Sequence, residues 1–481
     1  MNIIANATKY LSNTAVICKS RKFKYSDLIN HAFFVSQMLK DLPPQSNIVF
    51  LAPQAYEFIP LQWGIWLAGH VAVPLCTNHP PPEWDYILQD TNTPIVLCHD
   101  SFIPKLSPLT HSRNLPLLTI PDFFSVPTKF ERKVEVPQKD SSAQIIYTSG
   151  TTGRPKGAVT SHSAIYSQVS SLTSAWEWSS CDHILEILPL HHVHGNINVV
   201  TCALNSGALM TFHQKFEANA VWSEILNSNL SLLMGVPTIY LKLIQAYRSM
   251  QGSEQLEAKA ACSRFRLMVC GSMALPEFTL HEWQGITNQV LLERYGMTEC
   301  GMILSNSLHG KRKPGFVGKP LPGVEVSTKN SELLVKGPGL FSKYYNKPEA
   351  TKEAFDSEGW FRTGDIVDKD SEGDYKILGR ASVDILKVSG YKISALDVEN
   401  DLLSHPAISE VSILGLPDAV YGTKIGMIFT ANQQLSLKDI QTWCTSKMAP
   451  YKIPKVCLQV DEIPRNQMGK VNKKELVSLF N

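Results

Sequence analysis

The sequence predicts an α/β protein with a large N-terminal domain of α/β subdomains and a small α+β C-terminal domain. Short strand-like runs alternate with segments of helical apolar periodicity over roughly the first 240 residues, which is typical of largely parallel sheets covered by helices. Roughly the last hundred residues instead mix hairpin-like strands with helices. The length of 481 residues suits two or three domains.

Composition excludes several classes of protein. The chain has 45 basic and 43 acidic residues, a formal charge of +2, which gives no electrostatic footprint for nucleic acid or an anionic membrane. The ten cysteines contain no Cys-x-x-Cys pair, so neither a zinc module nor a disulfide framework is indicated. No apolar run reaches the ~18 residues of a membrane span. Reduced thiols and the lack of a recognisable leader or peroxisomal signal lead us to expect an intracellular, cytoplasmic protein.

The N-terminal elements follow from apolar spacing. Residues 99–141 are rich in Pro, Ser and Thr, and we expect them to form a long irregular connection. The expected strands are Ala15–Cys18, Asn47–Leu51, Val71–Leu75 and Ile95–Cys98, and the expected helices are Tyr25–Leu42 and Tyr56–Ala68.

A buried-type strand, Ala143–Tyr147, leads directly into a loop of small and hydroxylic residues with one lysine. Small residues let the backbone approach a ligand, their N–H and hydroxyl groups donate hydrogen bonds, and the lysine adds a point charge. The loop therefore predicts a polyphosphate site, with a flexible surface loop as the alternative. It is not a Walker A loop, because Pro155 interrupts that pattern. Its members are Thr148, Ser149, Gly150, Thr151, Thr152, Gly153 and Lys156.

Three histidines follow the apolar run Ile184–Leu190, at positions 191, 192 and 194. Zinc is disfavoured because residues i and i+2 of a strand project to opposite faces, and no further ligand follows at a suitable spacing. Purely structural histidines are one interpretation that the pattern leaves open. The next segment, Asn196–Ser206, is small and apolar and predicts a buried helix.

Three further segments repeat a plan of strand, turn and helix or loop. Leu232–Tyr240 reads as a strand that enters a helix, and Arg266–Pro276 as a strand, a Gly271-Ser272 turn and a helix start. A small-residue turn at the carboxyl end of a strand is where open α/β sheets bind ligands. Val290–Tyr295 is another expected strand, and the pair Thr298-Glu299 follows it.

Beyond these segments the pattern becomes antiparallel. Residues 324–326 and 332–336 alternate as hairpin strands. We place a domain boundary at Arg380, which gives an N-terminal domain of residues 1–379 and a C-terminal domain of residues 380–481. The elements expected after it are hairpin strands around Val383–Val388, helices Ala395–Leu403, Leu437–Lys447 and Lys473–Leu479, and strands Ile408–Leu416, Lys424–Thr430 and Val456–Val460.

The loop of residues 148–157, Thr-Ser-Gly-Thr-Thr-Gly-Arg-Pro-Lys-Gly, resembles the signature of the adenylate-forming superfamily of acyl-CoA synthetases, peptide-synthetase adenylation domains and luciferases. The resemblance covers nearly the whole chain. From about Leu188 onward the chain is similar to one branch, the eukaryotic malonyl-CoA synthetases, in segments such as Pro-Leu-x-His-Val-His-Gly and Glu-Arg-Tyr-Gly-Met-Thr-Glu. The chain departs from the family pattern at the hinge. The family usually has an aspartate two residues after Gly-Arg, whereas here the first aspartate after Arg380 is Asp384.

The resemblance implies a reaction in two halves. ATP and a carboxylate give an acyl-adenylate and pyrophosphate, and the thiol of coenzyme A then attacks the acyl carbon. Two anions must meet in the first half, so catalysis should depend on positioned cations and donors. By resemblance, Lys156 and its loop bind the β- and γ-phosphates, Glu299 holds Mg²⁺, Thr298 bonds a phosphate oxygen, and Lys470 bridges the carboxylate and the α-phosphate.

The remaining implied sites hold the nucleoside and the thiol. By resemblance, Gly271, Ser272 and Tyr295 form the adenine pocket, Asp365 and Arg380 bind the ribose, and Ser389 and Gly390 lie on the segment that admits coenzyme A. The expected partners are small molecules, with no nucleic acid and no membrane span, and the expected assembly is a monomer or a weak homodimer. A mitochondrial location is the alternative that the resemblance adds.

Malonate would make a physical demand, because its second carboxylate must be buried with a cation. Arg294 is the first candidate for that cation, and His192 and His194 are candidates to assist. The alternative for Arg294 is a structural ion pair. The alternative functions are a synthetase for short or medium monocarboxylates and a nucleotide-binding protein without catalysis.

Overall fold

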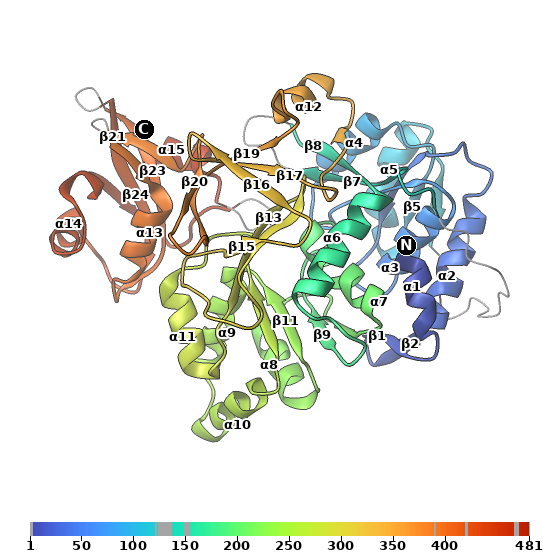
Figure 1. The fold of residues 1–481 in the computed structure, drawn as a ribbon, viewed down its shortest axis with the longest axis horizontal. Helices are drawn as coiled ribbons and strands as arrows, with labels where there is room; N and C mark the ends of the chain where they lie inside the picture. The colour runs from blue at the N-terminus through green and yellow to red at the C-terminus, as the bar shows by residue number, and fades with distance from the viewer. Residues whose placement is uncertain are drawn as a thin grey trace.

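Parallel strands buried within the protein form the body of the large domain (Figure 1). The computed structural model describes residues 3–120, 123, 137–148, 154–388, 391–418, 422–465 and 471–480. One large sheet has the order β15-β14-β13-β12-β11-β9-β10-β1-β2, parallel from β13 to β1 and antiparallel at both edges. Its strands are β1 (Thr14–Cys18), β2 (Arg21–Lys24), β9 (His183–Glu186), β10 (Leu209–Phe212), β11 (Leu232–Gly235), β12 (Leu267–Cys270), β13 (Leu292–Met297), β14 (Gly301–Ser305) and β15 (Lys319–Pro320).

Another sheet has the order β18-β8-β7-β4-β3-β5-β6 and is parallel from β7 to β6. Strand β8 pairs antiparallel with β7, and β18 reaches β8 from a distant part of the sequence. The strands are β3 (Asn47–Leu51), β4 (Val71–Pro74), β5 (Val96–Cys98), β6 (Leu117–Thr119), β7 (Ser142–Thr148), β8 (Lys156–Ser161) and β18 (Lys343–Tyr344).

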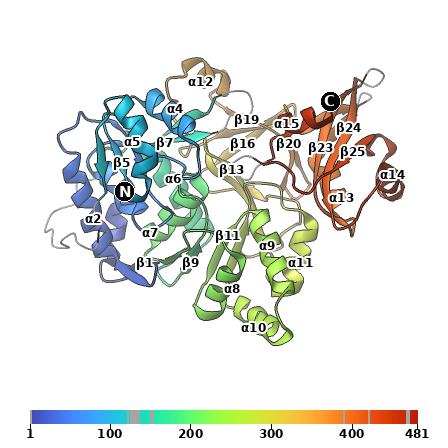
Figure 2. The ribbon, with the colours of Figure 1, turned by 180° about the vertical axis from the view of Figure 1, so that it is seen from behind.

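Helices cover these sheets and lie between them (Figure 2). Helix α3 is apolar on all sides, and it is buried from its first residue to Trp66, as a helix enclosed by other layers requires. None of the helices within the described ranges has the length and apolar character needed to cross a membrane. The helices of this domain are α1 (Ile3–Ala7), α2 (Tyr25–Met38), α3 (Phe58–Leu67), α4 (Pro81–Thr91), α5 (Ile103–Ser112), α6 (His162–Ala175), α7 (Cys202–Ser206), α8 (Ala218–Asn227), α9 (Pro237–Arg248), α10 (Gly252–Cys262), α11 (Glu277–Thr287) and α12 (Pro348–Ala354).

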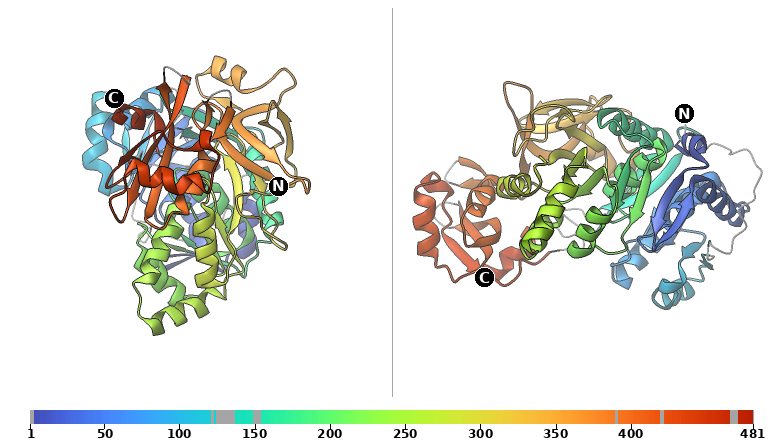
Figure 3. Two further views of the ribbon diagram at one scale, coloured as in Figure 1. Left: turned by 90° about the vertical axis from the view of Figure 1, so that its left-hand side faces the viewer. Right: turned by 90° about the horizontal axis from the view of Figure 1, so that it is seen from below.

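The C-terminal part forms a separate α+β unit with its own apolar core. It lies at one end of the molecule, beside α11 and the antiparallel sheet β16-β17-β19-β20 (Figures 1 and 3). The predicted fold class is therefore confirmed, whereas the exact boundary at Arg380 stays a prediction. The elements are β16 (Glu325–Lys329), β17 (Glu332–Lys336), β19 (Phe361–Lys369) and β20 (Tyr375–Arg380), followed by β21 (Ile385–Val388), β22 (Tyr391–Ser394), α13 (Ala395–Leu403), β23 (Ile408–Asp418), β24 (Gly422–Ala431), α14 (Leu437–Thr445), β25 (Val456–Gln459) and α15 (Lys473–Val477).

The prediction of an irregular connection over residues 99–141 was wrong for its first part. Helix α5 and strand β6 lie there, whereas residues 121–122 and 124–136 are outside the described ranges. Prolines concealed the helix. Pro104 occupies its first turn, where no N–H donor is needed, and Pro108 gives up one internal hydrogen bond. Leu106 and Thr110 are buried one turn apart and hold the helix in place.

The helix predicted over Asn196–Ser206 has a different form. A π-helix, η3 (His194–Thr201), begins two residues earlier, and the short α7 follows it. Its wider turn is a form often found at functional sites, and it begins at one of the three histidines.

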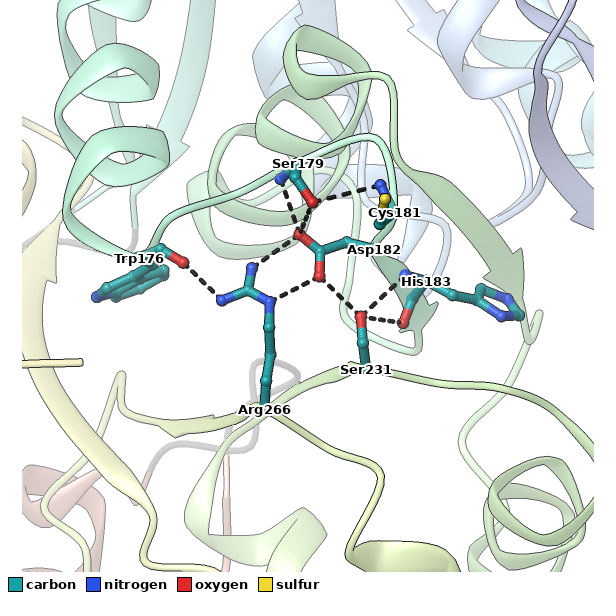
Figure 4. Close-up of polar contacts among 7 residues, drawn as sticks. All are labelled: Trp176, Ser179, Cys181, Asp182, His183, Ser231 and Arg266. Atoms are coloured by element: carbon teal, nitrogen blue, oxygen red, sulfur yellow. Dashed lines mark hydrogen bonds and ion pairs between the residues drawn. The ribbon is translucent and has the colours of Figure 1, made fainter. Parts of the chain in front are cut away.

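A buried polar cluster ties together the amino ends of three neighbouring strands of the larger sheet (Figure 4). Asp182 immediately precedes β9, Ser231 precedes β11 and Arg266 precedes β12. Arg266 donates to both oxygens of Asp182, from Nε at 2.7 Å and from Nη2 at 2.8 Å. Ser231 Oγ and the Ser179 backbone N–H also donate to this carboxylate, each at 2.8 Å, and Arg266 Nη1 donates to the Trp176 carbonyl at 2.7 Å.

We expect Arg266→Ala to lower the free energy of unfolding by roughly 3 kcal/mol, because Asp182 is only 3% exposed and would lose its cation. Urea denaturation measures this change. The matched control is Arg113→Ala, whose bond lengths to Asp85 are the same but whose carboxylate is 37% exposed. It should cost less than about 1 kcal/mol. Equal losses of unfolding free energy in the two variants would contradict the claim that the burial of Asp182 makes its ion pair the more stabilising one.

The same cluster predicts a pH dependence. Burial alone would raise the pKa of Asp182, but the hydrogen bonds from Arg266, Ser179 and Ser231 hold it below its usual value. The ionised carboxylate therefore stabilises the folded chain at neutral pH, and this stabilisation is lost as the pH falls through the folded-state pKa. The stability difference between wild type and Asp182→Asn should shrink on acidification.

Candidate active site

A cavity of about 1500 Å³ opens where the C-terminal unit meets the large domain. Segments that follow the carboxyl ends of β9, β11, β12 and β13 line one side of it. Leu396, Asp397 and Asn400 of α13, together with Val471 and Asn472, line the other side. This position at the carboxyl ends of parallel strands is the usual ligand site of open α/β sheets.

Every predicted site residue within the described ranges lines this one cavity. The fold brings these residues together, although some of them are more than two hundred positions apart in the sequence. They are Thr148, Lys156, His192, His194, Gly271, Ser272, Arg294, Tyr295, Thr298, Glu299, Asp365 and Arg380. The other predicted site residues, Ser149, Gly150, Thr151, Thr152, Gly153, Ser389, Gly390 and Lys470, lie outside the described residues.

The foot of the predicted phosphate loop is a strand pair. Thr148 ends β7 and faces Lys156, which begins β8. Tyr86 on α4 donates its hydroxyl to the carbonyl of Pro155 at 3.0 Å. The Arg154 guanidinium lies 5.4 Å from the centre of the same tyrosine ring. These contacts fix where the loop leaves and re-enters the sheet.

Glu299 and Thr298 follow the carboxyl end of β13 and line the same cavity as the loop foot. Glu299 is 5% exposed, and its Oε1 accepts a hydrogen bond from the hydroxyl of Tyr344 at 2.8 Å. Lys156 Nζ lies 5.1 Å from the centre of the Tyr344 ring. One buried carboxylate beside a hydroxyl suits Mg²⁺, which takes one or two protein carboxylates together with phosphate oxygens.

A second cluster joins three predicted nucleoside residues. The Tyr295 hydroxyl donates to Asp365 Oδ2, and Arg380 Nε forms an ion pair with Asp365 Oδ1 at 2.9 Å. Asp365 and Arg380 are also directly paired across β19 and β20. Each carboxylate oxygen has a further lone pair, so Asp365 can still accept hydrogen bonds from a ligand.

Asp384, the aspartate near the predicted hinge, forms hydrogen bonds with the backbone of Arg380. Asp384 Oδ2 accepts from the Arg380 backbone N–H at 3.0 Å, and the Asp384 N–H donates to the Arg380 carbonyl at 2.8 Å. Gly379 has a φ of +125°, and a Cβ there would lie 2.4 Å from the Cβ of Asp384. A side chain at Gly379 would therefore push this turn apart.

Arg294, Ser272 and His194 form a chain of contacts along the wall of the cavity. Ser272 Oγ lies 3.2 Å from His194 Nδ1 and accepts from Arg294 Nη2 at 3.4 Å. Ser272 has a φ of +70°, an uncommon conformation for a non-glycine residue that often occurs at functional sites. A Cβ on Gly271 would lie 2.7 Å from the guanidinium carbon, so only glycine lets Arg294 lie in this position.

The Arg294 guanidinium is buried without a balancing carboxylate. It is 3% exposed, its Nε has no hydrogen-bond partner, and within the described part of the chain it forms no ion pair. Burial lowers its pKa to about 10, which still leaves it charged at neutral pH. The alternative of a structural ion pair for Arg294 is therefore not supported. A buried charge of this kind calls for an anionic ligand.

The neighbouring histidines are not grouped with other possible metal ligands among the residues that the structure describes. Across the described ranges, no group of three or more His, Cys, Asp or Glu side chains is arranged to hold a metal ion. His194 is buried, and burial, with further contributions from Arg294 and His192, lowers its pKa well below the usual value. His194 is therefore neutral at physiological pH and can donate or accept a hydrogen bond.

Sequence reasoning missed several polar residues of the cavity, among them Glu293 and Tyr344. Burial raises the pKa of Glu293 to about 8, although the Gly315 N–H donates to it at 2.9 Å. The protonated carboxyl can donate as well as accept. Tyr344 lies on a two-residue strand and carries no local signal of a site.

The comparisons with known proteins agree with this geometry. Residues 4–345 match the AMP-binding enzyme family, and residues 397–470 match the AMP-binding enzyme C-terminal domain. The chain is 41% identical to a Xenopus laevis protein named mitochondrial malonate–CoA ligase ACSF3, over 99% of this chain and 92% of that protein.

Two solved structures cover nearly the whole chain. ATP-bound MatB of Rhodopseudomonas palustris is 29% identical with a TM-score of 0.90, covering 100% of this chain and 99% of MatB. A malonyl-CoA ligase ternary product complex with methylmalonyl-CoA and AMP bound is 30% identical with a TM-score of 0.69, covering 95% of this chain and 97% of that one. The match to residues 4–345 spans well over half of the chain, and the chain therefore belongs to the AMP-binding enzyme family.

Proposed function

We propose that the chain is an ATP-dependent malonate–CoA ligase, an acid–thiol ligase. ATP and malonate form malonyl-adenylate and pyrophosphate, and the thiol of coenzyme A then displaces AMP to give malonyl-CoA. The observation that carries the proposal is the buried Arg294 guanidinium without a carboxylate partner at the acyl end of the cavity. The names of the Xenopus relative and of the malonyl-CoA ligase structure support the same substrate class.

The charge of Arg294 favours a dicarboxylate over a fatty acid. The distal carboxylate of malonate would neutralise the guanidinium, and a guanidinium can bind a carboxylate through two parallel hydrogen bonds. An apolar acid in the same place would leave the buried charge unpaired, which is costly. His194 and His192 line the same end of the cavity and can complete the hydrogen bonds of the carboxylate. Methylmalonate, which has the same two carboxylates, is the expected second substrate.

The opposite end of the cavity suits the triphosphate. Lys156 supplies a positive charge beside Thr148, and the loop between them, by resemblance, binds the β- and γ-phosphates. Glu299 and Thr298 would hold Mg²⁺ and a phosphate oxygen, and the ion would neutralise phosphate charge when bound. Tyr295, Gly271 and Ser272 suit the adenine, and Asp365 with Arg380 suits the ribose.

We propose that Lys470 acts in the first half-reaction and that Ser389 and Gly390 admit coenzyme A in the second. Val471 and Asn472, which directly follow Lys470, line the cavity, and this supports the assignment. We further propose that residues 380–481 turn about Arg380 between the two half-reactions.

An acid panel tests this proposal. Purified protein with ATP and Mg²⁺ should exchange pyrophosphate into ATP with malonate, more slowly with methylmalonate, and weakly with acetate, butyrate or octanoate. Faster exchange with a monocarboxylate would assign the chain to synthetases of those acids. No exchange with any acid would favour nucleotide binding without catalysis.

Assembly and compartment belong to the same proposal. We expect a monomer or a weak homodimer, which light scattering of the purified chain would measure. The Xenopus relative is mitochondrial by name, and mitochondria are for this chain the alternative to the cytoplasm. Cell fractionation would separate the two.

A further inference from the structure

Tyr344 lies between two residues of opposite charge in the cavity. Its hydroxyl donates to Oε1 of Glu299 at 2.8 Å, and its ring centre lies 5.1 Å from Nζ of Lys156. The two charged residues come from different segments, at the start of β8 and after the end of β13. Tyr344 is therefore a direct physical link between the predicted phosphate-binding lysine and the predicted metal-binding carboxylate.

The backbone around Tyr344 holds it in this place. Strand β18 pairs with β8, with Tyr344 opposite Ala158. The N–H of Phe341 donates to the carbonyl of Glu299 at 2.6 Å, and the N–H of Tyr345 donates to the carbonyl of Gly157 at 2.8 Å. Segment 341–345 is thus bonded both to the strand that carries Lys156 and to Glu299 itself.

Each part of the tyrosine has a distinct effect on its neighbour. The hydroxyl donates a hydrogen bond to Oε1 of Glu299. This bond orients the carboxylate and leaves Oε2 available for a cation. Groups that orient a ligand residue in this way tune metal affinity. The ring attracts the Lys156 ammonium through its π face, and the N–H donors that point away from the ring can reach phosphate oxygens.

We propose that Tyr344 is a positioning residue that presents Glu299 to the divalent cation and Lys156 to the polyphosphate. This inference rests on the proposed function, because it takes ATP and its metal ion as the occupants of this end of the cavity. A purely structural role is the alternative, since the Tyr344 ring also packs on Phe341 with centroids 4.8 Å apart.

Two substitutions separate the hydroxyl from the ring. Tyr344→Phe keeps the ring under Lys156 and removes the donor to Glu299. Mn²⁺ binding in the presence of ATP, followed by electron paramagnetic resonance without any acid, should weaken by about tenfold. ATP binding without metal, measured by calorimetry, should stay within about twofold of wild type. Tyr344→Leu removes the ring as well, so metal-free ATP binding should also weaken several-fold.

The neighbouring tyrosine provides a matched control. Tyr345 directly follows β18, and its hydroxyl accepts from Asn47 Nδ2 at 2.8 Å instead of bonding to Glu299. Tyr345→Phe should bind Mn²⁺ and ATP like wild type. Unchanged Mn²⁺ binding in Tyr344→Phe, or an equal loss in Tyr345→Phe, would overturn the proposal. An equal loss of metal-free and metal-dependent ATP binding in Tyr344→Phe would assign Tyr344 a structural role.

The binding tests of Tyr344→Phe do not depend on which carboxylic acid is the substrate. If the Tyr344→Phe effect appears but wild type shows no malonate-dependent exchange, the proposed substrate is wrong and the role of Tyr344 stands. If wild type shows no metal-dependent ATP binding, both the proposed function and the role of Tyr344 are overturned.

Discussion

Arg294→Met is expected to lower kcat/KM for malonate-dependent pyrophosphate exchange by about a thousandfold. Removing one partner of a buried, hydrogen-bonded charge pair costs roughly 4 kcal/mol, which is about three factors of ten. The distal carboxylate of malonate would then be buried without a cation, whereas butyrate would meet an apolar side chain of similar length. Exchange kinetics with both acids measure the effect, and the ratio of malonate to butyrate should fall the most.

Two controls accompany this substitution. Arg294→Lys keeps the charge but not the planar fork, so its loss with malonate should be intermediate. The ligand-free Arg294→Met chain should be at least as stable as wild type, because burial already disfavours this charge and lowers its pKa to about 10. A large loss of stability in urea, or an equal loss of activity with malonate and butyrate, would mean that Arg294 supports the fold instead of the substrate.

Lys470→Ala is expected to lower malonate-dependent exchange by roughly a thousandfold, because the proposed role of its ammonium is to neutralise two anions that must meet. ATP binding should change little, because in the proposed function the nucleotide is bound by the loop with Lys156 and by the cluster of Tyr295, Asp365 and Arg380, whose members contact one another without Lys470. Exchange kinetics and calorimetry measure the two properties separately.

The matched control for this variant is Lys438→Ala, an exposed lysine of the same C-terminal unit. It should leave exchange and ATP binding unchanged. Exchange by Lys470→Ala at the wild-type rate would remove this lysine from the mechanism. Equal losses of exchange and of ATP binding would mean that Lys470 binds the nucleotide instead of acting on the reaction.

Local sequence patterns were sufficient for much of the candidate site. A buried strand followed at once by small or polar residues predicted positions 148 and 271, because parallel strands end at the same edge of a sheet, whereas position 298 was predicted by the family resemblance. The structure places all three positions around one cavity. The confirmed family membership also agrees with the resemblance first seen in the loop of residues 148–157.

Features set by tertiary packing were not predictable. The environment of Arg294 depends on the backbone of Gly271 and on Ser272, which come from another strand. Tyr344 gains its contacts only because β18 returns to β8 after a long excursion. Helix α5 was missed because its prolines contradict the local propensity, whereas its buried face outweighs them.

Direct identification of the products tests the central claim best. The purified chain should be incubated with malonate, ATP, Mg²⁺ and coenzyme A, and the products should be analysed by liquid chromatography with mass spectrometry. The account predicts malonyl-CoA with an equal amount of AMP, at a rate well above that of any thioester formed from acetate, butyrate or octanoate. Formation of ADP in place of AMP, or a faster thioester from a monocarboxylate, would contradict it.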